Sequence, residues 1–207
     1  MTKLDFKKEW KHLYNPPKTK FTVVDVPKMQ FLMVNGHGDP NTAQEYQDAI
    51  EALYGVAYKM KFISKKTLER DYVVPPLEGL WWAEDMATFS TARDKSQWDW
   101  TMMIMTPEWV TVDIFANAVT QVREAKNPLS LDKVRLEQYR EGLSVQIMHV
   151  GSFDDEGPVL AEMHSEFIPD NGYIENGKHH EIYLSDFRKV SPEKLRTVLR
   201  QPVLNVK

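Results

Sequence analysis

The chain has 207 residues, long enough to bury a sizeable core as one large domain or two small ones. A net charge of -4 gives no sign of the basic face that nucleic-acid binding requires, and the absence of cysteine excludes disulfides, thiolate chemistry and cysteine-based zinc sites. The charged segment 1–17 lacks the apolar core of a signal peptide, and no apolar run approaches the roughly 20 residues of a membrane helix. We therefore expect a soluble cytoplasmic protein without nucleic-acid or membrane partners.

The first half of the chain is expected to contain a short helix, two strands, a long helix and two further strands. In chain order these elements are residues 6–14, 21–26, 30–34, 41–62, 77–82 and 98–105, with a loop over 83–96. Pro27 and Lys28 are expected to form the turn between the first two strands. The long helix is predicted from apolar side chains at three- and four-residue spacing, with Asn41 or Thr42 as its N-cap.

A further helix is expected after the strand WDWTMMIM, with Pro107 as its first helical residue and Thr106 as its N-cap. The last third of the chain then repeats the order of the first. The elements expected there are strands 131–139 and 143–150, a helix over 153–168, and strands 178–184 and 197–203.

Both halves therefore share the order ββαββ, which predicts an internal duplication with pseudo-two-fold symmetry. We expect an α+β fold in which an antiparallel sheet carries two helices that flank a central ligand cleft. The expected division is an N-terminal arm, 1–19, and a ligand-binding domain, 20–207. Within that domain, half one covers 20–106, a linking helix 107–127, and half two 128–207.

The segment KHHEIYLSD alternates in the manner of a strand. His179, Glu181 and Tyr183 are expected on one face, and His180 and Ile182 on the other, core-facing side. A glutamate on a strand beside aromatic groups is suited to attract a cation, to orient a polar ligand or to hold a proton at a raised pKa. The alternative is a solvent-facing strand side with a salt bridge.

The C-terminal run KHHEIYLSDFRKVSPEKLRTVLRQPV resembles the closing signature of the GyrI-like small-molecule-binding domains. That signature is a Glu-x-Tyr-Leu strand, then an Asp, then a terminal strand that ends in Pro-Val. The matching residues are Glu181, Tyr183, Leu184, Asp186, Pro202 and Val203. The resemblance covers the chain from about Phe21 onward, includes the duplicated ββαββ order, and, through WDWTMMIMTPEWV, points to the stand-alone bacterial subgroup. No DNA-binding helix-turn-helix is expected before the domain.

The resemblance implies a cleft between two helices that takes bulky, flat, often cationic or amphipathic xenobiotics, and it places the family's cleft glutamate at Glu181. Some stand-alone members hydrolyse cyclopropane-bearing, DNA-alkylating natural products within an aromatic cage. The sequence is similar to that subset through Trp82, Trp98 and Trp100. We therefore expect a detoxifying hydrolase in which Glu181 acts as base or water-holder and Tyr183 as proton donor.

The residues expected to bind the ligand are Trp82, Trp100, Trp98, Tyr54, Met163 and His164. The alternative for the tryptophans is that they fill the core beneath the helices. Two other functions stay open: a non-catalytic protein that binds or sequesters drugs, and a protein inhibitor that acts by surface contact. The enzyme reading predicts an enclosed aromatic cavity, whereas the inhibitor reading predicts a protein partner.

No metal or cofactor is expected. His179 and His180 lie on opposite faces of one strand, so they cannot chelate the same ion, and His37, His149 and His164 are isolated in the sequence. The chain has no Gly-x-Ser-x-Gly elbow, and Gly-His-Gly at 36–38 is too short for a phosphate-binding loop.

Overall fold

The structure is a computed structural model that describes residues 2–84 and 94–206, so most of the loop expected over 83–96 lies outside the described residues. Two compact units make up the chain. Unit 1 comprises Met1–Glu9 and Met29–Tyr139, and unit 2 comprises Trp10–Lys28 and Arg140–Lys207. The predicted N-terminal arm therefore contributes residues to both units.

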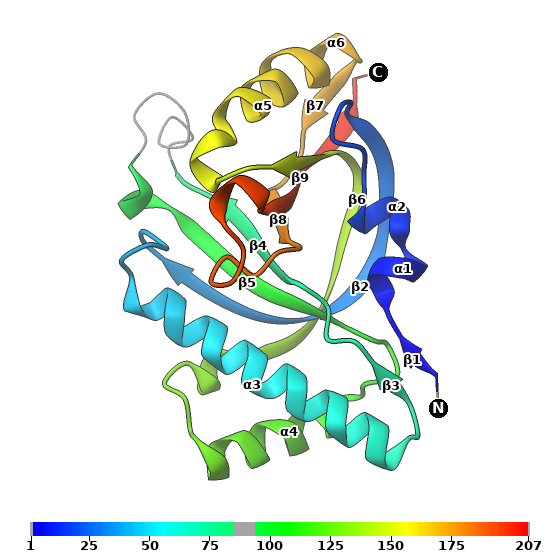
Figure 1. Cartoon of the computed structure of the whole chain (residues 1–207), viewed down its shortest axis with the longest axis vertical. Helices are drawn as coiled ribbons and strands as arrows, with labels where there is room; N and C mark the ends of the chain where they lie inside the picture. The colour runs from blue at the N-terminus through cyan, green and yellow to red at the C-terminus, as the bar shows by residue number, and fades with distance from the viewer. Residues whose placement is uncertain (1, 85–93, 207) are drawn as a thin grey trace. The chain divides into compact units, whose positions relative to one another are not determined.

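Unit 1 is built on β5 (Asp99–Thr106), which pairs antiparallel with β2 (Thr22–His37) on one edge and with β4 (Leu77–Trp82) on the other (Figure 1). The short strands β1 (Lys3–Leu4) and β3 (Asp71–Tyr72) form a separate parallel pair. The other elements of unit 1 are α1 (Phe6–Glu9), α3 (Gln44–Thr67), η2 (Lys95–Gln97), α4 (Val112–Ala125) and η3 (Leu131–Lys133).

The helix α3 packs against both β5 and α4. Its buried side chains recur at three- and four-residue intervals, which is the pattern that places them on one face of a helix. These residues are Tyr46, Ala49, Ala52, Leu53, Val56, Ala57 and Met60. The Tyr46 ring contacts the Trp100 ring, so α3 covers the face of β5 that also carries the fully buried Met102 and Ile104. A core of unit 1 therefore lies between α3 and this face of β5.

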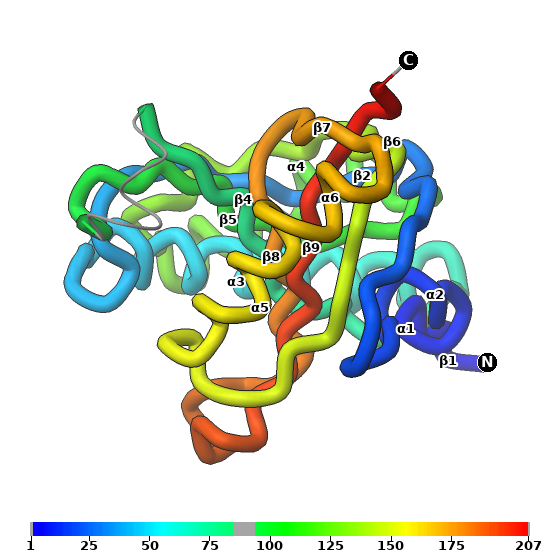
Figure 2. The backbone as a smooth tube through the Cα atoms, turned by 90° about the horizontal axis from the view of Figure 1, so that it is seen from above, coloured from blue at the N-terminus to red at the C-terminus, as the bar shows by residue number. Residues whose placement is uncertain are grey.

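Unit 2 is built on β9 (Arg196–Asn205). This strand pairs antiparallel with β6 (Arg135–Val150), β8 (His179–Tyr183) and β7 (Tyr173–Glu175), and Figure 2 shows it running between β6 and β8. The remaining elements are α2 (Lys11–Tyr14), η4 (Phe153–Asp155), α5 (Gly157–Glu162), the π-helical η5 (Met163–Phe167), α6 (Ile168–Asp170) and η6 (Pro192–Lys194). Its apolar core consists of Val145, Ile147, Met163, Ile168, Leu199 and Val203.

The α+β class and the antiparallel pairing are confirmed, but two expected turns are wrong. Pro27 and Lys28 lie inside the single strand β2, because proline fits extended dihedral angles and lacks only the N–H group that a partner strand would bind. Residues 140–142 likewise lie inside β6, where Gly142 has a φ of 78° and interrupts the regular ladder without ending the strand. Each half therefore reads one strand, a helical segment and three strands, which are β3, β4 and β5 in the first half and β7, β8 and β9 in the second. Internal duplication stays a prediction.

Two helix starts were placed wrongly. The N-cap of α3 is Ala43, since Thr42 and Ala43 belong to a turn whose amides donate to the carbonyl of Asp39. The helix α4 begins at Val112 and not at Pro107, because the Thr111 hydroxyl accepts a hydrogen bond from the Ile114 amide and caps it.

The helix expected over 153–168 is broken into η4, α5, η5 and α6. Pro169 has no N–H to donate to the preceding turn, which fits the change to a wider π-helical turn before it.

Candidate functional site

The strand β8 holds the two residues predicted to be catalytic. Glu181 and Tyr183 are two residues apart on one face of this strand, and both are half-buried. The Tyr183 hydroxyl donates a hydrogen bond of 2.7 Å to Glu181 Oε2. The expected juxtaposition is therefore confirmed, while the catalytic roles of the two residues stay predictions.

His179 lies on the same face of β8, two residues before Glu181. Its Nε2 atom is 3.7 Å from Glu181 Oε1, and the two side chains are only 10% and 16% exposed. Glu181 thus has a phenol hydroxyl beside one carboxylate oxygen and an imidazole nitrogen beside the other.

Aromatic rings lie next to the Glu181–Tyr183 pair. The Phe153 ring meets the Tyr183 ring edge-on at 5.7 Å, and Phe187 lies 6.5 Å from Phe153 in the same kind of arrangement. Phe187 is 46% exposed. Neither phenylalanine was predicted from the sequence, because both lie outside β8 and its alternation does not extend to them.

The two other unit 2 residues predicted to bind ligand differ in their surroundings. Met163 is completely buried in the apolar core. The His164 ring nitrogen Nδ1 lies 2.7 Å from Glu175 Oε1, and this hydrogen bond lowers the pKa of Glu175. The His164 ring is also 5.9 Å from the His179 ring, a neighbour that the isolation of His164 in the sequence does not reveal.

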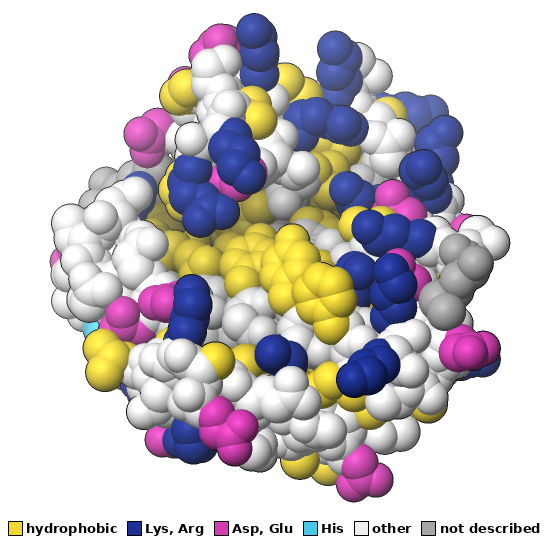
Figure 3. Space-filling view, turned by 60° about the horizontal axis from the view of Figure 1, so that its bottom comes forward, with side chains coloured by type: hydrophobic (Ala, Val, Ile, Leu, Met, Phe, Trp, Pro, Cys, Tyr) yellow, Lys and Arg dark blue, Asp and Glu magenta, His cyan; other side chains and the backbone are white. Residues whose placement is uncertain are grey.

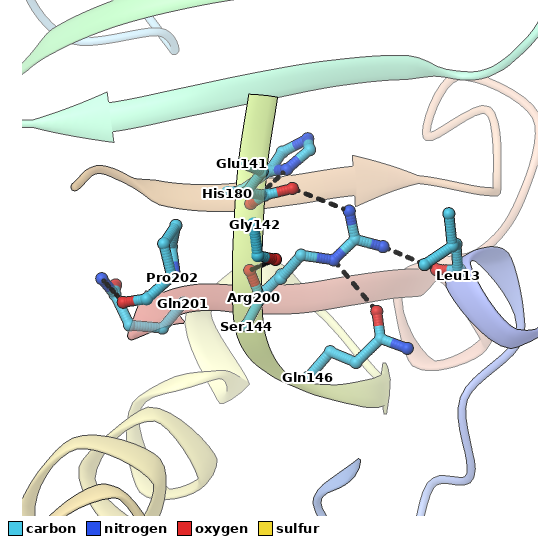
Figure 4. Close-up of polar contacts among 9 residues, drawn as sticks. All are labelled: Leu13, Glu141, Gly142, Ser144, Gln146, His180, Arg200, Gln201 and Pro202. Carbon is cyan, nitrogen blue, oxygen red and sulfur yellow. Dashed lines mark hydrogen bonds and ion pairs between the residues drawn. The ribbon is translucent and has the colours of Figure 1, made fainter. Parts of the chain in front are cut away.

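The opposite face of β8 carries an ion network that the sequence analysis missed (Figure 4). His180 Nδ1 lies 2.9 Å from Glu141 Oε1, and Arg200 donates to Glu141 Oε2 at 3.0 Å; all three side chains are at most 2% exposed. Arg200 also donates to the Gln146 side chain and to the Leu13 carbonyl.

The charges in this network control the ionisation of Glu141. Burial would raise the pKa of Glu141, but the opposing charges and hydrogen bonds of His180 and Arg200 hold it at about 2. His180 was expected on an ordinary core face, and the network shows that this face is buried but charged. It ties β6, β8 and β9 together behind the candidate site.

The tryptophans predicted to bind ligand lie in unit 1. Trp100 is completely buried, and its indole N–H donates to the Gly38 carbonyl at 3.3 Å. Trp82 and Trp98 are half-buried. The Trp98 ring meets the buried Trp81 ring edge-on at 5.8 Å. The role of these tryptophans in ligand binding stays a prediction.

Tyr54 belongs to a row of aromatic side chains on α3. Tyr58 and Phe62 follow at four-residue spacing, and they are 49% and 58% exposed. The Tyr54 and Tyr58 rings lie 6.2 Å apart. Figure 3 shows that hydrophobic side chains are exposed near the middle of one face, with Lys and Arg side chains close by. The aromatic surface around Tyr54 is therefore larger than the single residue predicted from the sequence.

Residues 19–204 match the family model described as a GyrI-like small-molecule-binding domain. The chain belongs to the GyrI-like family. Three crystal structures of Listeria innocua proteins are similar to this GyrI-like protein, and each alignment covers 98% of this chain and 100% of the other. One is of an uncharacterized conserved protein, with a TM-score of 0.88 at 44% identity. Two are of proteins named hydrolases, with TM-scores of 0.84 and 0.87 at 42% and 43% identity.

A more distant structure, the C-terminal domain of EcmrR, has a TM-score of 0.54 at 11% identity and covers 90% of this chain and 98% of its own. That likeness shows the fold alone. A search of the curated proteins found no match.

Residues 2–84 and 94–206 were searched for metal-binding groups and for membrane-spanning helices. In this part of the GyrI-like chain, no three His, Asp or Glu side chains are grouped so that they could hold a metal ion. No helix in the same part is long and apolar enough to cross a membrane.

Proposed function

We propose that this GyrI-like protein binds bulky aromatic or amphipathic xenobiotics and hydrolyses those that carry a strained cyclopropane, which protects the cell from DNA alkylation. The observation that carries the proposal is the half-buried Glu181 carboxylate, which accepts a hydrogen bond from Tyr183. The Tyr183 ring in turn packs edge-on against the Phe153 ring. The names of two relatives that are 42% and 43% identical, both called hydrolases, support a hydrolytic role.

The reaction needs only a general base and a proton donor. A water oxygen attacks a cyclopropane carbon, the carbon–carbon bond breaks, and its electron pair moves to a conjugated carbonyl oxygen. Glu181 takes the proton that the water loses, and the carbonyl oxygen gains a proton from a donor such as Tyr183 or from solvent. The product is the substrate plus one water molecule, so neither an oxidant nor a reductant is required.

Aromatic side chains would hold the flat part of such a ligand. Stacking contributes about 0.5–1.5 kcal/mol for each good pair of rings beyond the burial of area. We propose Trp82, Trp98 and Tyr54 as contributors, because all three are half-buried. Trp100 is less suited to a mutational test, since its complete burial means that truncation would also damage the core. The predicted ligand cleft and the enclosed aromatic cage stay part of this proposal.

The second candidate is a non-catalytic binder that sequesters drugs. The family description, a small-molecule-binding domain, favours this candidate as much as the first. The two candidates share the ligand and differ only in whether the ligand is recovered unchanged.

A mass-spectrometric assay separates the two candidates. Purified protein is incubated with a compound in which a cyclopropane is conjugated to a ketone, beside a protein-free sample. The hydrolase proposal predicts a product one water heavier, formed faster than in the protein-free sample and more slowly by a Trp82→Ala variant. Tight binding with intact compound recovered would leave a sequestering protein, and the absence of both binding and turnover would reject both candidates.

A further inference from the structure

The imidazole of His179 is buried without a hydrogen-bond partner for either ring nitrogen. The residue is 9% exposed, and neither Nδ1 nor Nε2 has a partner with hydrogen-bond geometry, although the Gln201 side chain lies close enough to raise the pKa of the ring. Buried polar atoms nearly always have a partner, because desolvating them without one costs free energy. The Nε2 atom lies 3.7 Å from Glu181 Oε1, and its lack of a partner points to a small polar molecule that binds between the two atoms.

The ring has the right chemistry to bind such a molecule. Burial, and then the neighbouring His164 and His180, lower the pKa of His179 to about 3, so the ring is neutral near neutral pH. A neutral imidazole donates from one nitrogen and accepts at the other. It can therefore accept a hydrogen bond from a water molecule without competing for the proton that the water releases.

The distance to Glu181 suits a single bridging molecule. His179 Nε2 and Glu181 Oε1 are 3.7 Å apart, too far for a direct hydrogen bond. A water oxygen at about 2.8 Å from each atom fits that separation. The other oxygen of Glu181 is already fixed by the Tyr183 hydroxyl at 2.7 Å, so the carboxylate presents a defined oxygen to the water.

The π-helical η5 places a second imidazole near the His179 ring. His164 belongs to the π-helical η5, a type of turn that is frequent at functional sites, and its Nδ1 atom is engaged by Glu175. Its ring lies 5.9 Å from that of His179. Neither His164 nor Glu175 supplies the partner that His179 lacks.

We propose that His179 and Glu181 together hold the water molecule that attacks the bound substrate. This inference rests on the hydrolase function proposed above. His179 accepts a hydrogen bond from one O–H of the water, and Glu181 accepts the other and then takes that proton as the new carbon–oxygen bond forms. His179 itself undergoes no net change in the reaction.

The test compares three variants with the wild-type protein. His179→Leu removes both nitrogens, His179→Gln retains an amide that can bind water, and His12→Gln is a matched control at an exposed histidine. Each variant is checked by thermal unfolding and then assayed for binding by tryptophan fluorescence and for turnover by mass spectrometry, with a cyclopropane conjugated to a ketone as the probe.

We expect His179→Leu to lower kcat about 100-fold with KM within threefold of wild type, since it removes one of the two groups that orient the water. His179→Gln should recover a substantial part of that loss, and His12→Gln should behave as wild type. A purely structural role would not give rescue by glutamine together with unchanged KM. A high-resolution crystal structure should show a water oxygen within hydrogen-bond distance of both atoms.

Two outcomes overturn the inference separately from the function. Wild-type turnover that is unchanged in folded His179→Leu would leave the hydrolase function standing and remove His179 from it. A high-resolution crystal structure with no water between His179 and Glu181 would also remove His179 from the mechanism. This second test would replace the first if His179→Leu failed to fold. Absence of turnover by the wild-type protein would instead reject the hydrolase function, and the attacking water with it.

Discussion

The indole ring of Trp100 lies directly against the backbone of Gly36, its partner across the β2–β5 pair. A Cβ atom added at Gly36 would lie 2.0 Å from Cη2 of that ring, far inside van der Waals contact. The absence of a side chain at Gly36 therefore makes room for the largest completely buried side chain of unit 1.

A Gly36→Ala variant is expected to lose about 1–3 kcal/mol of unfolding free energy, because the Trp100 ring must move in a close-packed core. Urea unfolding followed by tryptophan fluorescence measures this loss. Gly157→Ala is the matched control, since a Cβ there meets no atom within 4 Å. Equal stability of the two variants would show that the Trp100 ring shifts without cost.

The Glu141 network predicts a strong effect of neutralising one buried charge. Glu141→Gln leaves Arg200 and His180 without their carboxylate partner, and we expect a loss of about 3–5 kcal/mol. The folded-state pKa of Glu141, about 2, is below its ordinary value of 4.5. The stability that Glu141 contributes is therefore present above pH 4.5 and is lost as the pH falls towards 2.

Urea unfolding of wild type and Glu141→Gln at several pH values between 5 and 2 measures this effect on the free energy of unfolding. The difference between the two proteins should shrink as the pH falls. A difference that stays constant over that range would contradict the assigned charge state of Glu141.

The lowered pKa of His179 predicts that the free energy of unfolding also depends on pH in a higher range than for Glu141. Its pKa is lowered from 6.5 to about 3 by burial and by His164 and His180, against an opposing effect of Glu141. The unfolded chain therefore takes up a proton below pH 6.5 that the folded protein does not, and stability falls as the pH falls from 6.5 towards 3, by about 1.4 kcal/mol per pH unit at most. Unfolding of His179→Gln between pH 7 and pH 5 should show a weaker pH dependence than wild type, and parallel profiles would refute the assignment.

Tyr183→Phe is expected to keep the shape of the site and lose one hydrogen bond to Glu181. Because that bond favours the ionised carboxylate, its removal should raise the pKa of Glu181. If Glu181 is the base, the acidic limb of the pH profile of kcat/KM should move to higher pH. An unshifted limb with normal activity would exclude Tyr183 from the control of the base.

Alternation and helical spacing predicted most of the elements, because these patterns report directly on which side chains are buried. Strands at Leu77–Trp82 and Asp99–Thr106 and the common face of Glu181 and Tyr183 all follow from local pattern. The turn expected at Pro27 is wrong, since a proline inside a strand and a proline in a turn cannot be distinguished when the pairing partner is unknown.

The environment of the candidate site was less predictable, because it depends on contacts between segments far apart in the sequence. Glu141 and Arg200 meet across a separation of 59 residues, and nothing local marks His180 as their partner. Phe153 reaches Tyr183 from a different element, and His164 reaches His179 from a π-helical turn that periodicity does not reveal. Family resemblance supplied Glu181 as the cleft residue, and the structure adds its neighbours.

The most direct test of the account is the rate at which Glu181→Gln converts a cyclopropane conjugated to a ketone, measured by mass spectrometry beside the wild type and Glu162→Gln, a control at an exposed glutamate. We predict that Glu181→Gln binds the compound but forms the product one water heavier at least about 100-fold more slowly, whereas Glu162→Gln retains the wild-type rate. Binding and turnover by Glu181→Gln at the wild-type rate would contradict the central role of Glu181.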